Sequence, residues 1–190
     1  MVMAQIRIFI AVGLPEDVKT HLAAVTQVLA GQMPPRAVRW VTPERMHLTL
    51  RFLGDTAVDQ LPALTSALAA AVSPQPPFTL YLDHVGCFPN RKRPRVIWAG
   101  LSDTEKALPG FKQAVDACLA PLDWEPDERP FQPHLTLGRV KEGRWLADIN
   151  WGAPLERLAV PVAAVHLIES RLTPDGPIYT VRHTSPLSSK

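Results

Sequence analysis

Hydrophobic and polar residues alternate along several parts of the chain, which is the pattern of a half-buried β-strand. The clearest case is residues 5–12, where Ile6, Ile8, Ile10 and Val12 alternate with other side chains. The same pattern predicts further strands at residues 38–42, 46–53, 78–88, 95–101, 134–137, 157–170 and 177–184. Several of these strands follow one another without an intervening helix, so we expect a mixed or antiparallel sheet.

Three other segments carry apolar residues at helical spacing. In residues 15–31, Val18, Leu22, Val25 and Leu29 fall on one face. The other two predicted helices span residues 59–72 and 105–120, and the first of these is followed by Pro74-Gln75-Pro76-Pro77. Because proline cannot continue a helix or a central strand, this tetrapeptide is the clearest internal boundary in the chain.

The tetrapeptide His-Leu-Thr-Leu occurs twice, beginning at His47 and again at His134. Side chains two residues apart on a strand point to the same face. His47 and Thr49 therefore share one face, while the leucines face the other, and His134 and Thr136 repeat the arrangement. The two copies lie close to half the chain length apart.

This spacing predicts an internal duplication, although the halves share little sequence outside the motif. We expect a single α+β domain over residues 1–190 that is bilobal, with two pseudo-symmetric halves around a central cleft. Each half would contain a mainly antiparallel sheet and helices. Two such halves facing each other would place both His-Thr faces in the cleft.

Paired histidines of this kind suit acid–base catalysis at phosphorus. An imidazole has an ordinary pKa of about 6.5, so one copy can accept a proton from water while the other donates one to a leaving oxygen. In-line displacement requires the two groups to flank the phosphorus. Hydroxyl groups such as those of Thr49 and Thr136 can then donate hydrogen bonds to the non-bridging oxygens.

Two arginines are candidates for binding the same phosphate, because a guanidinium forms charge-assisted bonds with its oxygens. Arg51 lies four residues after His47, which places it on the polar face of that strand. Arg139 lies five residues after His134, so strict alternation turns it to the wrong face, unless a bulge at Gly138 redirects it. Phe9 is a candidate for stacking on a base, with core packing as the alternative.

Other kinds of site have little support. Zinc generally needs three or four His, Cys or carboxylate ligands, and neither motif lies in an HxH, HExxH or paired-cysteine pattern. We therefore predict no metal and no cofactor. A Gly-rich phosphate loop and a GxSxG elbow are also absent. The remaining histidines have no matched spacing and are interpreted as structural or solvated: His21, His84, His166 and His183.

The net charge of +2 gives no global signal for nucleic acid binding. The one dense basic patch is Arg91-Lys92-Arg93, which is either a solvated loop or a patch that attracts RNA phosphates. No apolar run approaches the length of a membrane span, and Cys87 and Cys118 have the spacing of free thiols. We expect a cytoplasmic monomer.

The motifs and their flanking stretches resemble the 2H phosphoesterases, and among them the RNA 2′,3′-cyclic phosphodiesterases, also called 2′-5′ RNA ligases. The resemblance covers nearly the whole chain in order. It rests on both His-Leu-Thr-Leu motifs, Arg7–Ala11, Leu14-Pro15, Trp40-Val41, Arg51–Gly54, Phe88–Asn90, Arg95–Gly100, Phe131–Pro133 and Glu169-Ser170.

This resemblance implies metal-independent hydrolysis of RNA 2′,3′-cyclic phosphate ends to 2′-phosphomonoesters. It also implies that His47 is the general acid, that His134 is the general base, and that Thr49, Thr136 and Arg139 hold the phosphate. Two alternatives use the same site. One is formation or cleavage of 2′-5′ bonds, and the other is an RNA-end binding module without catalysis.

Overall fold

The structure is a computed structural model that describes residues 4–125, 127, 130–141, 149–174 and 176–188. The strands are β1 (Gln5–Val12), β2 (Val38–Trp40), β3 (Leu48–Ala57), β4 (Phe78–Phe88), β5 (Val96–Ser102), β6 (His134–Val140), β7 (Ala159–Val162), β8 (Ala164–Thr173) and β9 (Gly176–Pro186). The helices are α1 (Glu16–Gly31), α2 (Leu61–Val72) and α3 (Leu108–Leu119), with 3₁₀ turns η1 (Pro43–Arg45), η2 (Val58–Gln60) and η3 (Ala120–Leu122).

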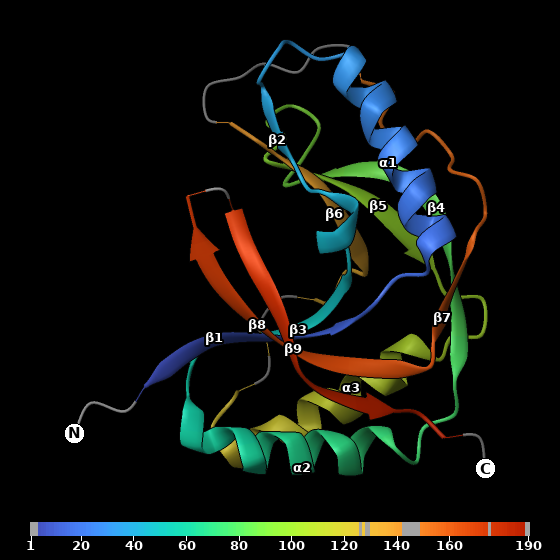
Figure 1. Ribbon diagram of the computed structural model, residues 1–190. Helices are drawn as coiled ribbons and strands as arrows, with labels where there is room; N and C mark the ends of the chain where they lie inside the picture. Colours follow the sequence, from blue (N-terminus) through green and yellow to red (C-terminus); the bar gives the residue numbers. More distant parts are fainter. Residues whose placement is uncertain (1–3, 126, 128–129, 142–148, 175, 189–190) are drawn as a thin grey trace.

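The nine strands form one curled sheet (Figure 1). Eight of them follow the order β7-β4-β5-β6-β3-β1-β8-β9, and β2 pairs with the end of β6 that β3 does not reach, at residues 138–140. Every pairing between the described strands is antiparallel. In the middle of the sheet, β3 and β6 meet through a single residue pair, Leu48 and Leu135. This narrow joint divides the sheet into a β3-β1-β8-β9 half and a β6-β5-β4-β7 half. The prediction of an α+β fold with an antiparallel sheet is confirmed.

Neither half of the sheet is continuous in sequence. Strand β2 comes from the first part of the chain but pairs with β6, and β8 and β9 come from its end but pair beside β1. The predicted strand at residues 157–170 is wrong in one respect, because it divides at Ala163 into β7, at one edge of the sheet, and β8, which lies in the other half between β1 and β9. Pro161 has no N–H to donate, and β7 accordingly lies at the sheet edge.

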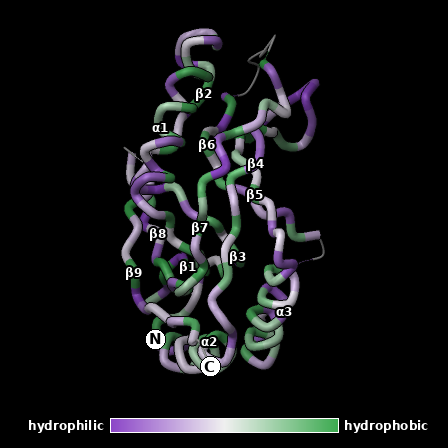
Figure 2. Tube along the Cα trace, turned by 90° about the vertical axis from the view of Figure 1, so that its right-hand side faces the viewer, coloured by the Kyte–Doolittle hydropathy of each residue, from purple (hydrophilic) through white to green (hydrophobic). Residues whose placement is uncertain are grey.

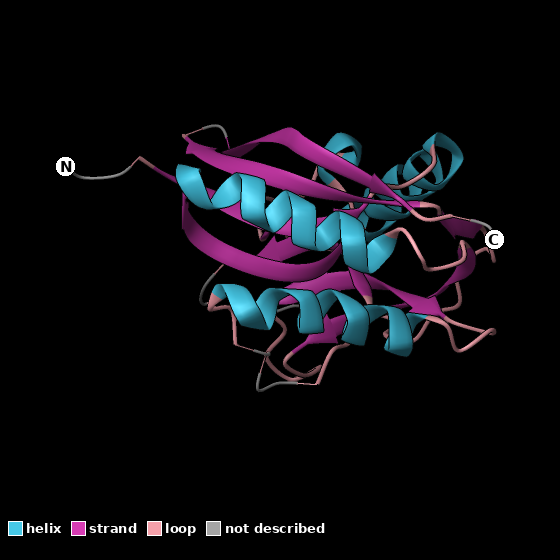
Figure 3. Cartoon of the chain, turned by 90° about the horizontal axis from the view of Figure 1, so that it is seen from below, coloured by secondary structure: helices cyan, strands magenta, loops and turns pink. Residues whose placement is uncertain are grey.

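The helices cover the two ends of the molecule. α2 and α3 lie side by side at one end, and α1 lies at the other (Figures 2 and 3). In α1, Glu16 and Asp17 occupy the first turn, where the helix dipole favours acidic groups. Its buried residues are Val18, Leu22 and Leu29, three of the four apolar residues that predicted this helix. These side chains join one core that continues through the strands of both halves.

Two predicted helices begin later than the apolar pattern indicated. The segment that starts at Asp59 first forms η2, and α2 begins at Leu61. α3 begins at Leu108 rather than at Glu105, because Pro109 is compatible only with a first helical turn. The carboxylate of Asp103 accepts a hydrogen bond from the Leu108 N–H at 2.8 Å. This bond satisfies one of the N–H groups that the start of a helix leaves free.

Candidate active site

A cleft of about 140 Å³ lies between the two halves of the sheet. Its lining is contributed by β2, η1, β3, β6 and β9: Arg39, Trp40, Val41, Arg45, His47, Thr49, Phe52, Thr136, Arg139, Pro177 and Tyr179. Of the predicted site residues, the cleft thus brings together His47, Thr49, Thr136 and Arg139. His134 is not part of this lining, but its charge is near enough to lower the pKa of His47.

The joint between β3 and β6 sets the relative positions of the two motifs. Because Leu48 pairs with Leu135 in an antiparallel ladder, His47 lies on the side of Thr136, and Thr49 lies on the side of His134. Each imidazole of one half therefore faces the hydroxyl of the other half. This crossed arrangement gives the cleft an approximate twofold symmetry around one residue pair.

The two imidazoles are oriented by the same backbone contact. Nδ1 of His47 lies 2.8 Å from the carbonyl oxygen of Arg45, and Nδ1 of His134 lies 2.7 Å from that of Gln132. A carbonyl oxygen can only accept a hydrogen bond, so each Nδ1 carries the proton. Nε2 is then the nitrogen that is free to exchange a proton with a substrate in each ring.

Aromatic side chains support both imidazoles from behind. The ring of His47 stacks on Phe9 with centroids 4.7 Å apart and meets Tyr179 edge-on at 5.4 Å. His134 meets Phe88 edge-on at 5.0 Å. Burial lowers the pKa of His47 to about 4, and it also lowers the pKa of His134. In the free protein both rings are therefore neutral at pH 7.

A β-bulge after the threonine of each motif decides which later side chain reaches the cleft. Leu50 is skipped in the register between β3 and β1, and Leu137 is skipped in the register between β6 and β5. Alternation then resumes one residue late. Arg139 consequently points into the cleft, and Phe52 takes the equivalent place in the other half. The predicted irregularity at Gly138 lies one residue earlier, at Leu137.

The same kind of bulge makes the prediction for Arg51 wrong. Arg51 does not share the polar face of His47, because the extra residue at Leu50 turns it to the opposite face. Its side chain is 6% exposed, and Nη1 lies 2.8 Å from a carboxylate oxygen of Asp127. Its guanidinium also donates to the carbonyl of Glu125. Arg51 therefore holds the loop after α3 and does not contact the cleft.

The predicted role of Phe9 in substrate binding required its ring to line the cleft, and it does not. It is 3% exposed and packs with Ala11, Ile168 and Tyr179 in a small cluster on the cleft side of β1. Its ring is covered on one side by the imidazole of His47. The alternative of core packing is confirmed, and Phe9 supports a catalytic candidate instead of a base.

Sequence reasoning missed several residues of the cleft. Arg39 lies opposite Arg139 in the pairing of β2 with β6. The alternation around Trp40 predicted the strand but gave only weak evidence that Arg39 faces a site. Arg45 precedes the first motif by two residues, a position that could have identified it. Tyr179 comes from β9, and nothing local in the sequence indicates that β9 returns to the first motif.

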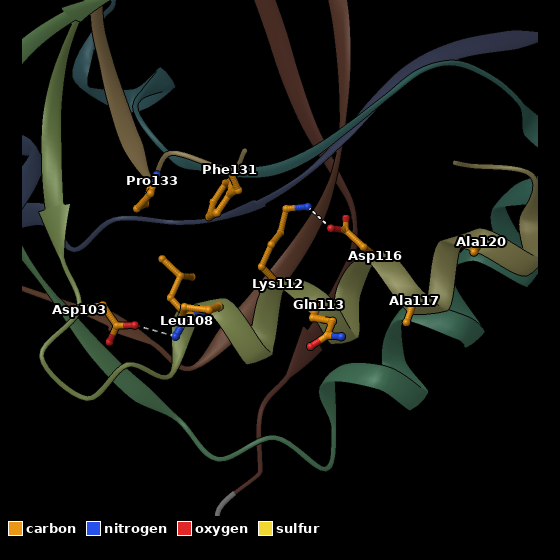
Figure 4. Close-up of a pocket in the computed structure, with 10 residues that line it drawn as sticks. Asp103, Leu108, Lys112, Gln113, Asp116, Ala117, Ala120, Phe131 and Pro133 are labelled. Atoms are coloured by element: carbon orange, nitrogen blue, oxygen red, sulfur yellow. Dashed lines mark hydrogen bonds and ion pairs between the residues drawn. The ribbon is translucent and has the colours of Figure 1, made fainter. Parts of the chain in front are cut away.

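A larger pocket of about 570 Å³ lies beside α3 and is mostly apolar (Figure 4). Within it, Lys112 forms an ion pair with Asp116 and lies 5.3 Å from the centroid of the Phe131 ring. No histidine is among its described lining residues. Because Lys112 is paired with Asp116, and Asp103 accepts a hydrogen bond from the Leu108 N–H, the pocket offers no acid–base pair comparable to that of the cleft.

Other groups named from the sequence take no part in the cleft lining. His21, His84, His166 and His183 lie outside it, and Arg91-Lys92-Arg93 forms an exposed loop between β4 and β5. Cys87 and Cys118 are free thiols. Within the part of the chain that the structure describes, no group of three or more His, Cys, Asp or Glu residues is placed to hold a metal ion. The described helices include none that is long and apolar enough to cross a membrane.

Comparisons with known proteins show the family to which this chain is similar. The family model LigT like Phosphoesterase matches residues 12–98 and 101–179. A protein of Methanothermobacter thermautotrophicus named RNA 2′,3′-cyclic phosphodiesterase is 33% identical over 180 residues, which cover 93% of this chain and 96% of that protein. One of Thermotoga maritima with the same name is 32% identical over 180 residues, covering 92% of each chain.

Solved structures share the fold. The crystal structure of the Thermus thermophilus protein TT0787 superimposes with a TM-score of 0.80 and 32% identity, over 95% of this chain and 97% of that one. The structure of Escherichia coli LigT complexed with 3′-AMP gives a TM-score of 0.80 and 27% identity, over 98% and 100%. Family model, sequence relatives and fold agree: the chain belongs to the LigT-like phosphoesterase family, within the 2H phosphoesterases.

Proposed function

We propose that this protein hydrolyses 2′,3′-cyclic phosphate ends of RNA to 2′-phosphomonoesters without a metal ion. The observation that carries the proposal is the matched pair of imidazoles. His47 and His134 each bind a backbone carbonyl through Nδ1, and each leaves Nε2 for a substrate. Relatives named RNA 2′,3′-cyclic phosphodiesterase support the choice of substrate.

In the proposed reaction, His134 takes a proton from water as its oxygen bonds to phosphorus. The bond from phosphorus to the 3′-oxygen breaks, and His47 gives that oxygen its proton. The product carries a 2′-phosphate and a 3′-hydroxyl. Thr49 and Thr136 donate hydrogen bonds to the non-bridging oxygens, and Arg139 balances the charge that develops on them.

The low pKa of His47 constrains how the acid becomes charged. A ring with a pKa of about 4 is neutral in the free protein at pH 7. An anionic phosphate beside the ring favours its protonated form and raises that pKa. We therefore expect His47 to acquire its proton together with the substrate. The burial that lowers the pKa also makes the protonated ring a strong donor to the leaving oxygen.

The test is an end-product analysis on a short RNA with a 2′,3′-cyclic phosphate, in the presence of EDTA. We expect a 2′-phosphate end. The variants His47→Ala and His134→Ala should each lower kcat by roughly a hundredfold or more, the scale of general acid–base catalysis. Full activity in either variant would contradict the paired mechanism. Tight binding of the RNA without turnover would instead indicate an RNA-end binding module, and a 2′-5′-linked product would indicate ligation.

A further inference from the structure

Three guanidinium groups converge on the active-site cleft. Arg39 on β2, Arg45 on η1 and Arg139 on β6 all line it, and no aspartate or glutamate is among its described lining residues. Burial raises the pKa of Tyr179, and the positive charges of Arg139, Arg45 and Arg39 act against this rise, so all three lie near its ring. The positive charge of the cleft thus comes from three different elements that meet at one aromatic side chain.

The backbone holds these charges close to one another. Arg39 and Arg139 are direct partners in the β2–β6 ladder, where like charges on one face repel. The guanidinium of Arg45 lies against Gly176, the first residue of β9. A Cβ atom on Gly176 would lie 2.5 Å from Nη1 of Arg45, so the guanidinium rests on bare backbone there. Gly176 has a φ of +114°, a conformation that L side chains rarely adopt.

Two arginines outside the cleft differ from these three, because each of them forms an ion pair with a carboxylate. Arg51 pairs with Asp127, and Arg182 pairs with Glu169. Among the residues that the structure describes, no carboxylate lies within ion-pair distance of Arg39, Arg45 or Arg139. Repulsion among these like charges is reduced when an anion binds between them.

One cyclic phosphate does not account for three cations. The diester carries a single negative charge, and the proposed function already places it against Thr49, Thr136 and Arg139. Arg39 and Arg45 remain beside it. The substrate ends at the cyclic phosphate, so any second phosphate of the RNA must be attached to the 5′-oxygen of the same nucleotide or further upstream.

We propose that Arg39 and Arg45 form a subsite for the phosphate on the 5′-oxygen of the reacting nucleotide. This inference rests on the proposed function and specifies its substrate class. The preferred substrate is then an oligonucleotide end or a 5′-phosphorylated nucleotide, and a nucleoside 2′,3′-cyclic phosphate with a free 5′-hydroxyl is a poorer one. Arginine suits this role because its planar fork binds phosphate oxygens in pairs.

The experiment compares adenosine 2′,3′-cyclic phosphate carrying a 5′-hydroxyl with the same compound carrying a 5′-phosphate. We expect the unsubstituted protein to show a kcat/KM about tenfold or more higher for the 5′-phosphate, on the scale of a charge-assisted hydrogen bond. In Arg39→Gln and Arg45→Gln this ratio should fall toward one. Arg45→Gln keeps the backbone carbonyl that orients His47.

Arg7→Gln is the matched control for loss of one positive charge, because Arg7 is exposed on β1 and outside the cleft lining. It should keep the ratio of the unsubstituted protein. Equal losses on both substrates in the Arg39 and Arg45 variants would overturn the proposal, because they would assign these residues to the scissile phosphate. An unchanged ratio in both variants would overturn it as well.

A binding measurement separates failure of this inference from failure of the proposed function. Calorimetry with adenosine 2′-monophosphate and adenosine 2′,5′-bisphosphate needs no turnover. We expect the bisphosphate to bind more tightly to the unsubstituted protein, and the difference to disappear in Arg39→Gln and Arg45→Gln. If the protein hydrolyses neither cyclic compound, the proposed function fails while this difference still tests the subsite. Equal affinities would reject the subsite.

Discussion

The burial of His47 links its proposed catalytic role to the stability of the protein. Its ring is packed on Phe9, and burial lowers its pKa from 6.5 to about 4. In the unfolded chain the ring takes up a proton near pH 6.5, but in the folded protein it stays neutral until about pH 4. The unfolded state therefore binds more protons between these values, and the contribution of His47 to stability is lost as the pH falls through this window.

We therefore expect the free energy of unfolding to fall on acidification more steeply in the unsubstituted protein than in His47→Gln. The difference between the two should change by roughly 3 kcal/mol between pH 7 and pH 4, since one pKa unit corresponds to about 1.4 kcal/mol. Urea unfolding at a series of pH values measures it. Parallel pH profiles for the two proteins would show that the imidazole is not held neutral.

At the scale of single residues, the sequence predicts the face to which a side chain points, as long as the strand is regular. His47, Thr49 and Thr136 reach the cleft because alternation holds through each motif. Arg51 and Arg139 were assigned less well, because the bulges that follow each motif are set by how β3 and β6 pair with their neighbours. A bulge is a property of two strands, and a single strand's sequence does not specify its position.

The contact between β2 and β6 depends on an amino acid without a side chain. A Cβ atom on Gly138 would lie 2.6 Å from Cγ1 of Val38 and 2.8 Å from Cε3 of Trp40. Neither atom is the far end of a long, flexible side chain that could move aside, and both belong to residues of β2. Gly138→Ala must therefore push β2 away from β6, and β2 carries Arg39 into the cleft.

We expect Gly138→Ala to destabilise the protein by about 1–3 kcal/mol, the usual effect of overfilling a packed site. Gly31→Ala is the matched control, because a Cβ atom there would meet nothing within 4 Å. Thermal unfolding of both variants measures the effect. A melting temperature for Gly138→Ala as high as that of the control would mean that β2 is not tightly packed on β6.

Elements with strong local signals were predicted well, and their connections were not. The apolar spacing of Val18, Leu22 and Leu29 is enough to specify α1. By contrast, the apolar residues of 157–170 form two strands in different halves of the sheet, and the pattern does not show the break at Ala163. Strand pairing depends on contacts between distant parts of the chain, which periodicity does not record.

The whole molecule is organised around the joint between its two halves. Each half of the sheet carries one histidine and one threonine of the motifs, but neither half comes from one continuous part of the chain. β2, from the N-terminal part, pairs with β6, and β8 and β9, from the C-terminal part, lie beside β1. The repeated motif predicted facing halves, but it could not predict this arrangement, because β2 and β9 carry no copy of the motif. The internal duplication itself stays a prediction.

A ligand that bridges the joint should stabilise the molecule through both halves. If the phosphate of adenosine 2′-monophosphate binds between Thr49 and Thr136, saturating amounts should raise the melting temperature by ~5–10 °C, given about 2.7 kcal/mol at a hundredfold excess over Kd. Thr49→Ala and Thr136→Ala remove one contact from each half, so each should reduce the shift. Thr104→Ala, at an exposed threonine outside the cleft lining, should leave it unchanged. A loss in only one of the two cleft variants would mean that the phosphate is held by one half alone, and the joint would then have no part in binding.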